Sequence, residues 1–228
     1  MSARNLSIQA IPACDAKPWI LERHYAKRLC PISFAFGLYR ESNLIGVVTY
    51  GTPASATLRE GVAGKEWSNR ILELNRLCCE SQKNAASRLV AGSLKMLPKP
   101  LIVVSYADIG QGHVGYIYQA TNFLYTGLSA KRTDWKIKGM EHLHGATVAD
   151  ESRGKKNRAQ WMREKYGDKF YLEERSRKHR YLFLCGTKRQ KAEMAKSIRY
   201  KTEPYPKGES LRYDASQPIT QQTTFALK

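Results

Sequence analysis

The sequence predicts an α/β (α+β) fold in which a mixed central β-sheet has helices on both faces, with a basic insertion and a C-terminal extension. Two observations lead to this prediction. Short apolar segments of the strand type alternate along the chain with segments of helical periodicity. In addition, residues 101–108 form an almost continuous apolar run between Pro100 and Asp108, which is typical of an interior strand covered on both faces.

The N-terminal segment predicts one strand and one helix. Residues 6–11 alternate between apolar and polar side chains, as a half-buried strand does. Asp15 can cap a helix that carries Pro18 in its first turn. We expect this helix to end near His24 and Tyr25.

A hairpin and a loop are expected next. Pro31 breaks the chain, and residues 33–39 and 44–50 are rich in β-branched and aromatic residues. The short polar turn at 41–43 predicts that these two segments pair as an antiparallel hairpin. Residues 53–68 are expected to form a loop.

The middle of the chain predicts two strand–helix pairs and a further strand. Residues 71–78 read as a strand, and residues 84–97 read as a helix that Asn84 caps. The buried strand 101–108 leads into a short helix that carries Tyr118. A strand near residues 123–129 follows.

The last hundred residues contain a polar, basic and irregular segment at 130–180, with one helix expected near 156–166. Residues 180–185 return as a strand, and a basic helix is expected near 188–198. The tail at 214–228 is rich in Gln, Thr and Ser, so we expect it to be disordered. We therefore expect one domain over residues 1–228 with an insertion at 130–180.

Net charge points to nucleic acid as a partner. The formal charge is +18, and residues 131–210 alone hold 22 Lys and Arg against 11 Asp and Glu. Aromatic residues lie among these basic ones, so a polyanion such as DNA is a better partner than solvent alone, although a merely solvated basic surface is the alternative. The candidate DNA-binding residues are Lys155, Lys156, Arg158, Arg163, Lys165, Arg177, Lys178 and Arg180.

Composition also bears on the cellular compartment. The five cysteines are odd in number and form no Cys-x-x-Cys spacing, so we expect reduced thiols and no metal site. The chain has no apolar run long enough for a membrane helix and no signal core at its N-terminus. We therefore expect a cytoplasmic protein with no membrane partner.

Asp108 and Tyr118 are the first candidates for chemistry. Ligands of open α/β sheets bind outside the carboxyl ends of the strands, where Asp108 is expected. A carboxylate there can accept a hydrogen bond or a proton from a substrate amine, and a phenol can act as an acid. The alternatives are a loop-capping aspartate and a packed tyrosine.

The order of elements resembles the GCN5-related N-acyltransferase (GNAT) fold. Tyr118-x-x-x-Asn122-Phe123, before a strand that ends in Gly127, is similar to the Tyr-x-x-x-Gly-Phe segment of that superfamily, and Asn122 stands where the family has glycine. The resemblance implies that Tyr118 is a general acid to a departing thiolate. It also implies an acyl-CoA donor such as acetyl-CoA.

One departure concerns this donor. The superfamily's glycine-rich pyrophosphate loop is replaced here by residues 80–84, Glu-Ser-Gln-Lys-Asn, which contain no glycine for close backbone approach. The start of the following helix can still attract an anion, with Lys83 and Asn84 beside it. Acyl-CoA use is therefore open.

Seven short segments carry a more specific resemblance: His24-Tyr25-x-Lys27, Tyr50-Gly51, Leu72-Glu-Leu-x-Arg76-Leu77, Val104-Ser-Tyr-Ala-Asp108, Tyr118-x-Ala120-x-Asn122-Phe123, Lys178-His-Arg-Tyr181 and Pro204-Tyr-Pro-Lys207. They resemble the Mom-type DNA-modification proteins of phage Mu and related phages. The resemblance implies transfer of a carbamoylmethyl-type group to N6 of adenine in double-stranded DNA in the bacterial host, which protects phage DNA from restriction. It also implies that His24, Tyr25 and Ser93 join Asp108 and Tyr118 as catalytic residues. Arg76, within an apolar strand, is expected to contact the donor or DNA, or else to form a structural ion pair with Glu73 or Asp108.

Two other functions fit the same residues. The fold could serve an acyltransferase acting on tRNA or protein, or the chain could be a non-catalytic basic DNA-binding protein. The sequence leaves open the donor, any metal requirement, the recognised DNA sequence and the oligomeric state.

Overall fold

A computed structural model describes residues 6–143 and 145–208. Its described residues form two compact units: residues 6–127 together with 179–208, and residues 128–143 together with 145–178. The smaller unit thus interrupts the sequence of the larger one, and the expected single domain with a DNA-binding insertion at 130–180 stays a prediction. The tail at 214–228 lies outside the described residues.

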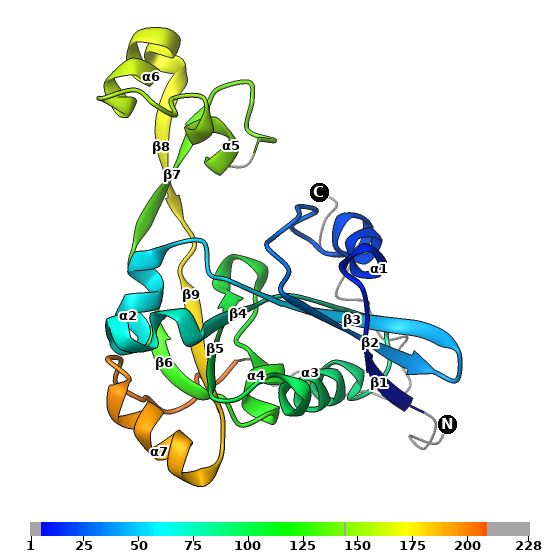
Figure 1. The fold of residues 1–228 in the computed structure, drawn as a ribbon. Coiled ribbons are helices and arrows are strands. Elements are labelled where there is room, and N and C mark those ends of the chain that lie inside the picture. Colours follow the sequence, from blue (N-terminus) through cyan, green and yellow to red (C-terminus); the bar gives the residue numbers. More distant parts are fainter. Residues whose placement is uncertain (1–5, 144, 209–228) are drawn as a thin grey trace. The chain divides into compact units, whose positions relative to one another are not determined.

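The larger unit is built on one seven-stranded mixed sheet (Figure 1), with strand order β1-β2-β3-β4-β5-β9-β6. Neighbours from β1 to β4 are antiparallel, whereas β4 and β5 are parallel. The predicted hairpin is confirmed: β2 and β3 pair from Phe34 with Tyr50 to Arg40 with Asn43. The strands are β1 (Leu6–Ala10), β2 (Phe34–Arg40), β3 (Asn43–Gly51), β4 (Ile71–Cys79), β5 (Leu101–Asp108), β6 (Leu124–Leu128) and β9 (Lys178–Cys185).

Helices cover both faces of this sheet, as predicted. Adjacent residues of a strand point to opposite faces, and in β5 Val103 packs in the cluster that includes Leu89 of α3. Its neighbour Ile102 packs instead with Val62 of α2 and Met194 of α7. The helices are α1 (Ala13–Pro18), which continues as a π-helical turn (Trp19–Arg23), α2 (Ala56–Trp67), α3 (Ala85–Met96), α4 (Tyr116–Ala120) and α7 (Lys188–Ser197).

The expectation of a loop at residues 53–68 was wrong, because α2 lies there. Two glycines within the segment hid the helix, and Gly64 does break the regular helical backbone with a φ of 83°. The Ser55 side chain caps the helix by accepting a hydrogen bond from the Leu58 N–H. Burial of Val62 against the sheet then outweighs the poor helix propensity of glycine.

Two predicted caps also differ from the structure. The first helix begins at Ala13 with Pro12 as its N-cap, so Asp15 lies inside its first turn instead of capping it. Asn84 does precede α3, but its backbone is left-handed (φ 60°) and its side chain makes no capping hydrogen bond. Asn122 adopts the same left-handed region (φ 60°), which explains why asparagine can stand there in place of glycine.

The smaller unit is more regular than the sequence indicated. Besides the predicted helix, α6 (Arg158–Tyr166), it contains the helix α5 (Gly145–Asp150) and an antiparallel pair formed by β7 (Arg132–Ile137) and β8 (Phe170–Arg175). These elements enclose a core of their own, made of Ile137, Val148, Met162 and Phe170. Trp135, Leu143, Trp161 and Tyr166 pack against these four residues. The polar and basic residues between them masked the apolar pattern in the sequence.

Candidate active site

The candidate site lies where β4 and β5 part. Their parallel register runs from Ile71 with Ile102 to Leu74 with Ser105 and ends there, although β5 continues to Asp108. At this last pair the Ser105 hydroxyl donates a hydrogen bond of 3.0 Å to the Leu74 carbonyl. Ser105 therefore places a buried hydroxyl at the point of divergence.

Tyr118, on α4, forms a hydrogen bond with the Ser105 hydroxyl. A hydrogen bond with Ser105 favours the phenolate, but burial outweighs it and raises the pKa of Tyr118 to about 12. The Tyr118 ring lies 5.2 Å from the Tyr181 ring and 5.3 Å from the Phe123 ring, measured between centroids. At neutral pH Tyr118 is thus a protonated phenol, which can give a proton to a leaving group but cannot serve as a base.

Asp108 is the last residue of β5, at the carboxyl end of the strand as predicted. Its Oδ1 accepts a hydrogen bond of 2.9 Å from the Gly110 N–H, so it does cap the loop that follows. The capping and catalytic interpretations are compatible, because a carboxylate has several acceptor positions. The loop then turns back, and the His113 N–H donates to the Asp108 carbonyl over 3.1 Å.

The segment after the π-helical turn brings His24 and Tyr25 toward the same loop. His24 is nine-tenths buried, and its Nδ1 accepts a hydrogen bond of 3.0 Å from the Ala26 N–H. Tyr25 is partly exposed, with its ring centroid 4.3 Å from that of His24 and 6.1 Å, edge-on, from that of His113. The structure therefore gathers Tyr25 with a histidine that the sequence analysis did not select.

The pKa values indicate that these groups share one environment. The Tyr25 phenol and the Glu73 carboxylate on β4 each add to the rise in the pKa of Tyr118. The Asp108 carboxylate raises the pKa of His113, although burial dominates and lowers it below the ordinary 6.5. Glu73 was considered only as an ion-pair partner in the sequence. A glycine-rich loop directly after Asp108 was the signal that could have pointed to His113.

Ser93 lies in the core of the larger unit. It is fully buried on α3, where its hydroxyl donates to the Val90 carbonyl and lies 2.6 Å from the Tyr50 hydroxyl. Because Ser93 Oγ uses its proton on Val90, Tyr50 is the donor of the shared hydrogen bond. A direct catalytic role for Ser93 stays a prediction.

The candidate donor-binding residues lie at two places on the larger unit. Arg76, on β4, donates to the carbonyls of Asn75 (2.7 Å) and Arg28 (3.1 Å), while its Nε is buried without a hydrogen-bond partner. Lys83 and Asn84 are exposed at the turn before α3. Arg76 thus ties β4 to the segment after Tyr25, and the other two stand at a helix N-terminus.

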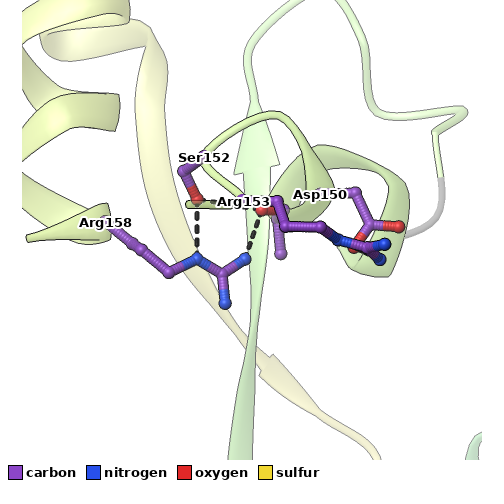
Figure 2. A network of polar contacts seen from close by, with 5 residues as sticks. Asp150, Ser152, Arg153 and Arg158 are labelled. Atoms are coloured by element: carbon purple, nitrogen blue, oxygen red, sulfur yellow. Dashed lines mark hydrogen bonds and ion pairs between the residues drawn. The ribbon is translucent and has the colours of Figure 1, made fainter. Parts of the chain in front are cut away.

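Among the DNA-binding candidates of the smaller unit, the arginines Arg158 and Arg177 make side-chain hydrogen bonds within it. Figure 2 shows Arg158 donating to the Ser152 hydroxyl (3.0 Å) and to the Ala149 carbonyl, next to the exposed Asp150–Arg153 pair. Arg177 donates to the Ser129 carbonyl over 2.7 Å. Both arginines therefore stabilise the fold of the smaller unit.

Arg180 belongs to the larger unit. Its guanidinium donates to the Thr126 hydroxyl (3.0 Å) and carbonyl (2.6 Å), and lies 3.3 Å from the centroid of the Tyr200 ring. Arg180 therefore joins β9 to β6, a role that the sequence analysis did not foresee.

The lysines around α6 are more exposed. Lys165 pairs with Glu151 over 3.0 Å at the surface, and the ammonium groups of Lys155 and Lys165 lie 5.5 and 5.1 Å from the Trp161 ring centroid. Lys156 and Arg163 are exposed, whereas Lys178, at the start of β9, is half-buried. The surface of the smaller unit thus carries basic groups beside an aromatic ring.

Comparisons with known proteins identify relatives of this chain. The sequence profile of the Mom protein family matches residues 5–207. The chain is 26% identical over 219 residues, 90% of its length, to the methylcarbamoylase mom of Escherichia phage Mu, of which it covers 85%. In the described residues no helix is long and apolar enough to cross a membrane.

Solved structures that match are acetyltransferases. One is an N-acetyltransferase from Staphylococcus aureus Mu50, with 13% identity, a TM-score of 0.43, and coverage of 79% of this chain and 99% of that one. Another is the ribosomal-protein-S5-alanine acetyltransferase from Vibrio fischeri, with 9% identity, a TM-score of 0.44, and coverage of 81% and 96%.

Proposed function

The chain belongs to the Mom protein family, and on this premise we propose that it transfers a carbamoylmethyl-type group to N6 of adenine in double-stranded DNA. The observation that carries the proposal is the 26% identity to the phage Mu methylcarbamoylase, which extends over 90% of this chain. The biological consequence would be protection of phage DNA from restriction in the bacterial cytoplasm.

The adenine amine sets the demands on the site. Its lone pair is delocalised into the ring, and in a duplex it is stacked and paired, so the base must be extruded and aligned with the donor. In our proposal the Asp108 carboxylate accepts a hydrogen bond from the N6 amine. His24 and Tyr25 form the wall beside it, supported by the ring contact of 4.3 Å between them.

Tyr118 would act on the leaving group of the donor. A phenol with a pKa of about 12 keeps its proton throughout the neutral range, so it can pass that proton to the leaving group as the donor breaks down. Its hydrogen bond with the buried Ser105 would hold the phenol near the last pair of β4 and β5, Leu74 with Ser105. Ser93 would act indirectly, by holding Tyr50 in the core cluster against which Tyr118 packs.

The donor that we propose is an anionic thioester such as acyl-CoA. The residues fit such a group: the N-terminus of the twelve-residue helix α3 offers backbone N–H groups to a phosphate, and Lys83 adds a positive charge. Asn84 already occupies the left-handed position that a glycine would otherwise fill. The unpartnered Nε of Arg76 offers one further donor. The thiolate would be the leaving group: a thioester carbonyl would deliver an acyl group to N6, whereas direct delivery of a carbamoylmethyl-type group requires the thiolate on its methylene carbon.

DNA phosphates would be held by the basic residues of the smaller unit. Because Arg158 and Arg177 are committed to hydrogen bonds inside the unit, we assign the phosphate contacts first to the exposed Lys155, Lys156 and Arg163, with Lys165 beside them. If about six to ten phosphate contacts form in all, affinity should fall about 10³–10⁵-fold between 50 and 200 mM salt.

The test is mass spectrometry of nucleosides from bacteria that express the protein. We expect a deoxyadenosine carrying the added group, together with resistance of the DNA to restriction enzymes. Asp108→Asn and Tyr118→Phe should each lower the yield about 10²–10⁴-fold, because the first removes the carboxylate that holds the amine and the second removes the acid. The control is Lys201→Ala, an exposed change far from both residues in the sequence.

Only unmodified deoxyadenosine, obtained with soluble folded protein, would contradict the proposal. Modification found on tRNA or protein instead would select an acyltransferase with another acceptor. Intact phenotypes in the Asp108 and Tyr118 variants, together with loss in Lys155, Lys156 and Arg163 variants, would select a non-catalytic DNA-binding protein.

A further inference from the structure

We propose that His113 is a further catalytic residue of this site, the group that accepts the proton lost by the adenine amine. This inference rests on the proposed function. It assigns the base to a residue in the loop after β5, and it gives Asp108 the task of orienting that base and stabilising its charged form.

The loop brings His113 back to the strand end that it leaves. Asp108 Oδ1 accepts from the Gly110 N–H, a short 3-10 turn covers Ile109–Gln111, and Gly112 reverses the chain with a φ of 67°. The His113 N–H then donates to the Asp108 carbonyl over 3.1 Å. Five residues beyond Asp108, His113 is therefore again beside that residue.

The loop is held firmly on its far side. The Val114 carbonyl accepts hydrogen bonds from the Tyr181 hydroxyl and from the Gln119 side chain (3.2 Å). At Gly115 a Cβ would lie only 2.4 Å from the Tyr181 ring, so the backbone packs directly against it. Tyr205 anchors the C-terminal segment by donating to the Phe123 carbonyl over 2.7 Å. A rigid support of this kind is what an acid–base group needs.

The surroundings of His113 suit a base that works near neutral pH. Burial lowers its pKa below 6.5, so the imidazole is neutral at pH 7 and can take up a proton. The nearby Asp108 carboxylate acts in the opposite direction and stabilises the imidazolium once it forms. The His113 ring is roughly perpendicular to that of Tyr25, with 6.1 Å between the centroids, and Tyr25 also contacts His24.

The other two buried histidines are already engaged. His24 Nδ1 accepts from the Ala26 N–H, and His179 Nδ1 is 2.9 Å from the Tyr125 hydroxyl in the core. Both are nine-tenths buried, whereas His113 is only half-buried, beside the partly exposed Tyr25. Of these three histidines, His113 is the one that a substrate amine can reach.

In the transfer step one bond to the donor carbon forms while another breaks. The N6 lone pair forms a bond to the electrophilic carbon of the donor while the bond from that carbon to its leaving group, such as a thiolate, breaks and its electron pair departs with the leaving group. One N6 proton moves to the ring nitrogen of His113. The leaving group takes its proton from Tyr118, and both residues regain their starting states by exchange with solvent.

The experiment uses cleared lysate of expressing cells, which supplies the natural donor, with added unmodified plasmid DNA. Modified deoxyadenosine is measured by mass spectrometry for the wild type, His113→Gln, His113→Ala and the control His142→Gln, an exposed histidine outside this loop. We expect His113→Gln to lose about 10²–10⁴ in rate with an unchanged melting temperature. The control should match the wild type.

Two further readouts separate proton transfer from a structural role. The wild-type rate should fall as pH drops through the lowered pKa of His113, and the residual rate of His113→Gln should lack this acidic limb. Added imidazole should partly restore His113→Ala. A His113→Gln rate within threefold of wild type, or a loss with neither of these two signatures, would overturn the inference while the proposed function stands. Wild-type lysate that forms no modified deoxyadenosine would remove the proposed function itself, and the inference with it.

Discussion

The hydrogen bond between Tyr50 and Ser93 supports a prediction that distinguishes stability from catalysis. Both side chains are fully buried, their oxygens are 2.6 Å apart, and Ser93 also donates to the Val90 carbonyl. Among the residues that the structure describes, Ser93 Oγ is the one side-chain acceptor of the Tyr50 hydroxyl, so Ser93→Ala leaves that hydroxyl without a partner in an apolar core. Burial already raises the pKa of Tyr50, which shows how poorly the core solvates it.

The loss of stability in each variant depends on which hydroxyl is left without a hydrogen-bond partner. Leaving a buried hydroxyl unpaired costs about 1–3 kcal/mol, and the better helix propensity of alanine on α3 returns up to about 0.5 kcal/mol. Tyr50→Phe should cost less, about 0.5–1.5 kcal/mol, because Ser93 keeps its bond to Val90. In the double variant neither hydroxyl remains, so the two effects should not add.

The assay is thermal unfolding of the four proteins of this cycle, with the yield of modified deoxyadenosine measured beside it. About 1 kcal/mol corresponds to about 2–4 °C in a chain of this size. We expect Ser93→Ala to melt lowest and the double variant to be more stable than the sum of the single changes predicts. An unchanged melting temperature in Ser93→Ala with lost modification would refute this reasoning and favour a direct catalytic role for Ser93.

Three further predictions test other parts of the structure. Gly115→Ala should lower the free energy of unfolding by about 2–4 kcal/mol, because its backbone is left-handed and the added Cβ would lie 2.4 Å from the Tyr181 ring. Gly112 is also left-handed but has no atom within 4 Å of such a Cβ, so Gly112→Ala should cost only about 1–2 kcal/mol. Calorimetry measures both changes. In DNA-binding titrations, Arg163→Ala should reduce the slope of log affinity against log salt concentration by about 1. The control Arg189→Ala changes an exposed arginine paired with Glu193 and should leave the slope unchanged. Equal slopes in the wild type and both variants would show that Arg163 does not contact DNA. Burial lowers the pKa of His179 below 6.5, so the unfolded chain binds a proton more readily and stability should fall as pH drops below about 6.5. His179→Gln should show a smaller drop in melting temperature between about pH 7.5 and 5.5, and an unchanged drop would argue against this assignment.

Much of the fold could be predicted because its signals are local. The apolar run of β5, the hairpin of β2 and β3 and the amphipathic face of α3 each arise from a few neighbouring residues. The helix α2 and the antiparallel pair of β7 and β8 were missed for the opposite reason. Their stability comes from burial of Val62 and Ile137 against distant segments, which no local pattern records.

The candidate site divides in the same way. Asp108 and Tyr118 could be selected from the sequence, because a carboxylate that ends a buried strand and a tyrosine in a family motif are recognisable along the chain. His113, Glu73 and Ser105 could not, since each matters only through what lies beside it in space. The reverse holds for Arg158, Arg177 and Arg180, whose charge indicated DNA while the structure gives each an internal hydrogen bond.

By itself, then, the sequence determined the class of fold, the family and the basic character of the insertion, and it selected Asp108 and Tyr118 as candidates for the site. Only the tertiary structure decided which histidine stands beside Asp108, which arginines are occupied within their units, and that Ser93 is a core residue. The physical reason is that charge and periodicity are properties of the chain, whereas burial and hydrogen-bond partnership depend on residues that meet only after folding.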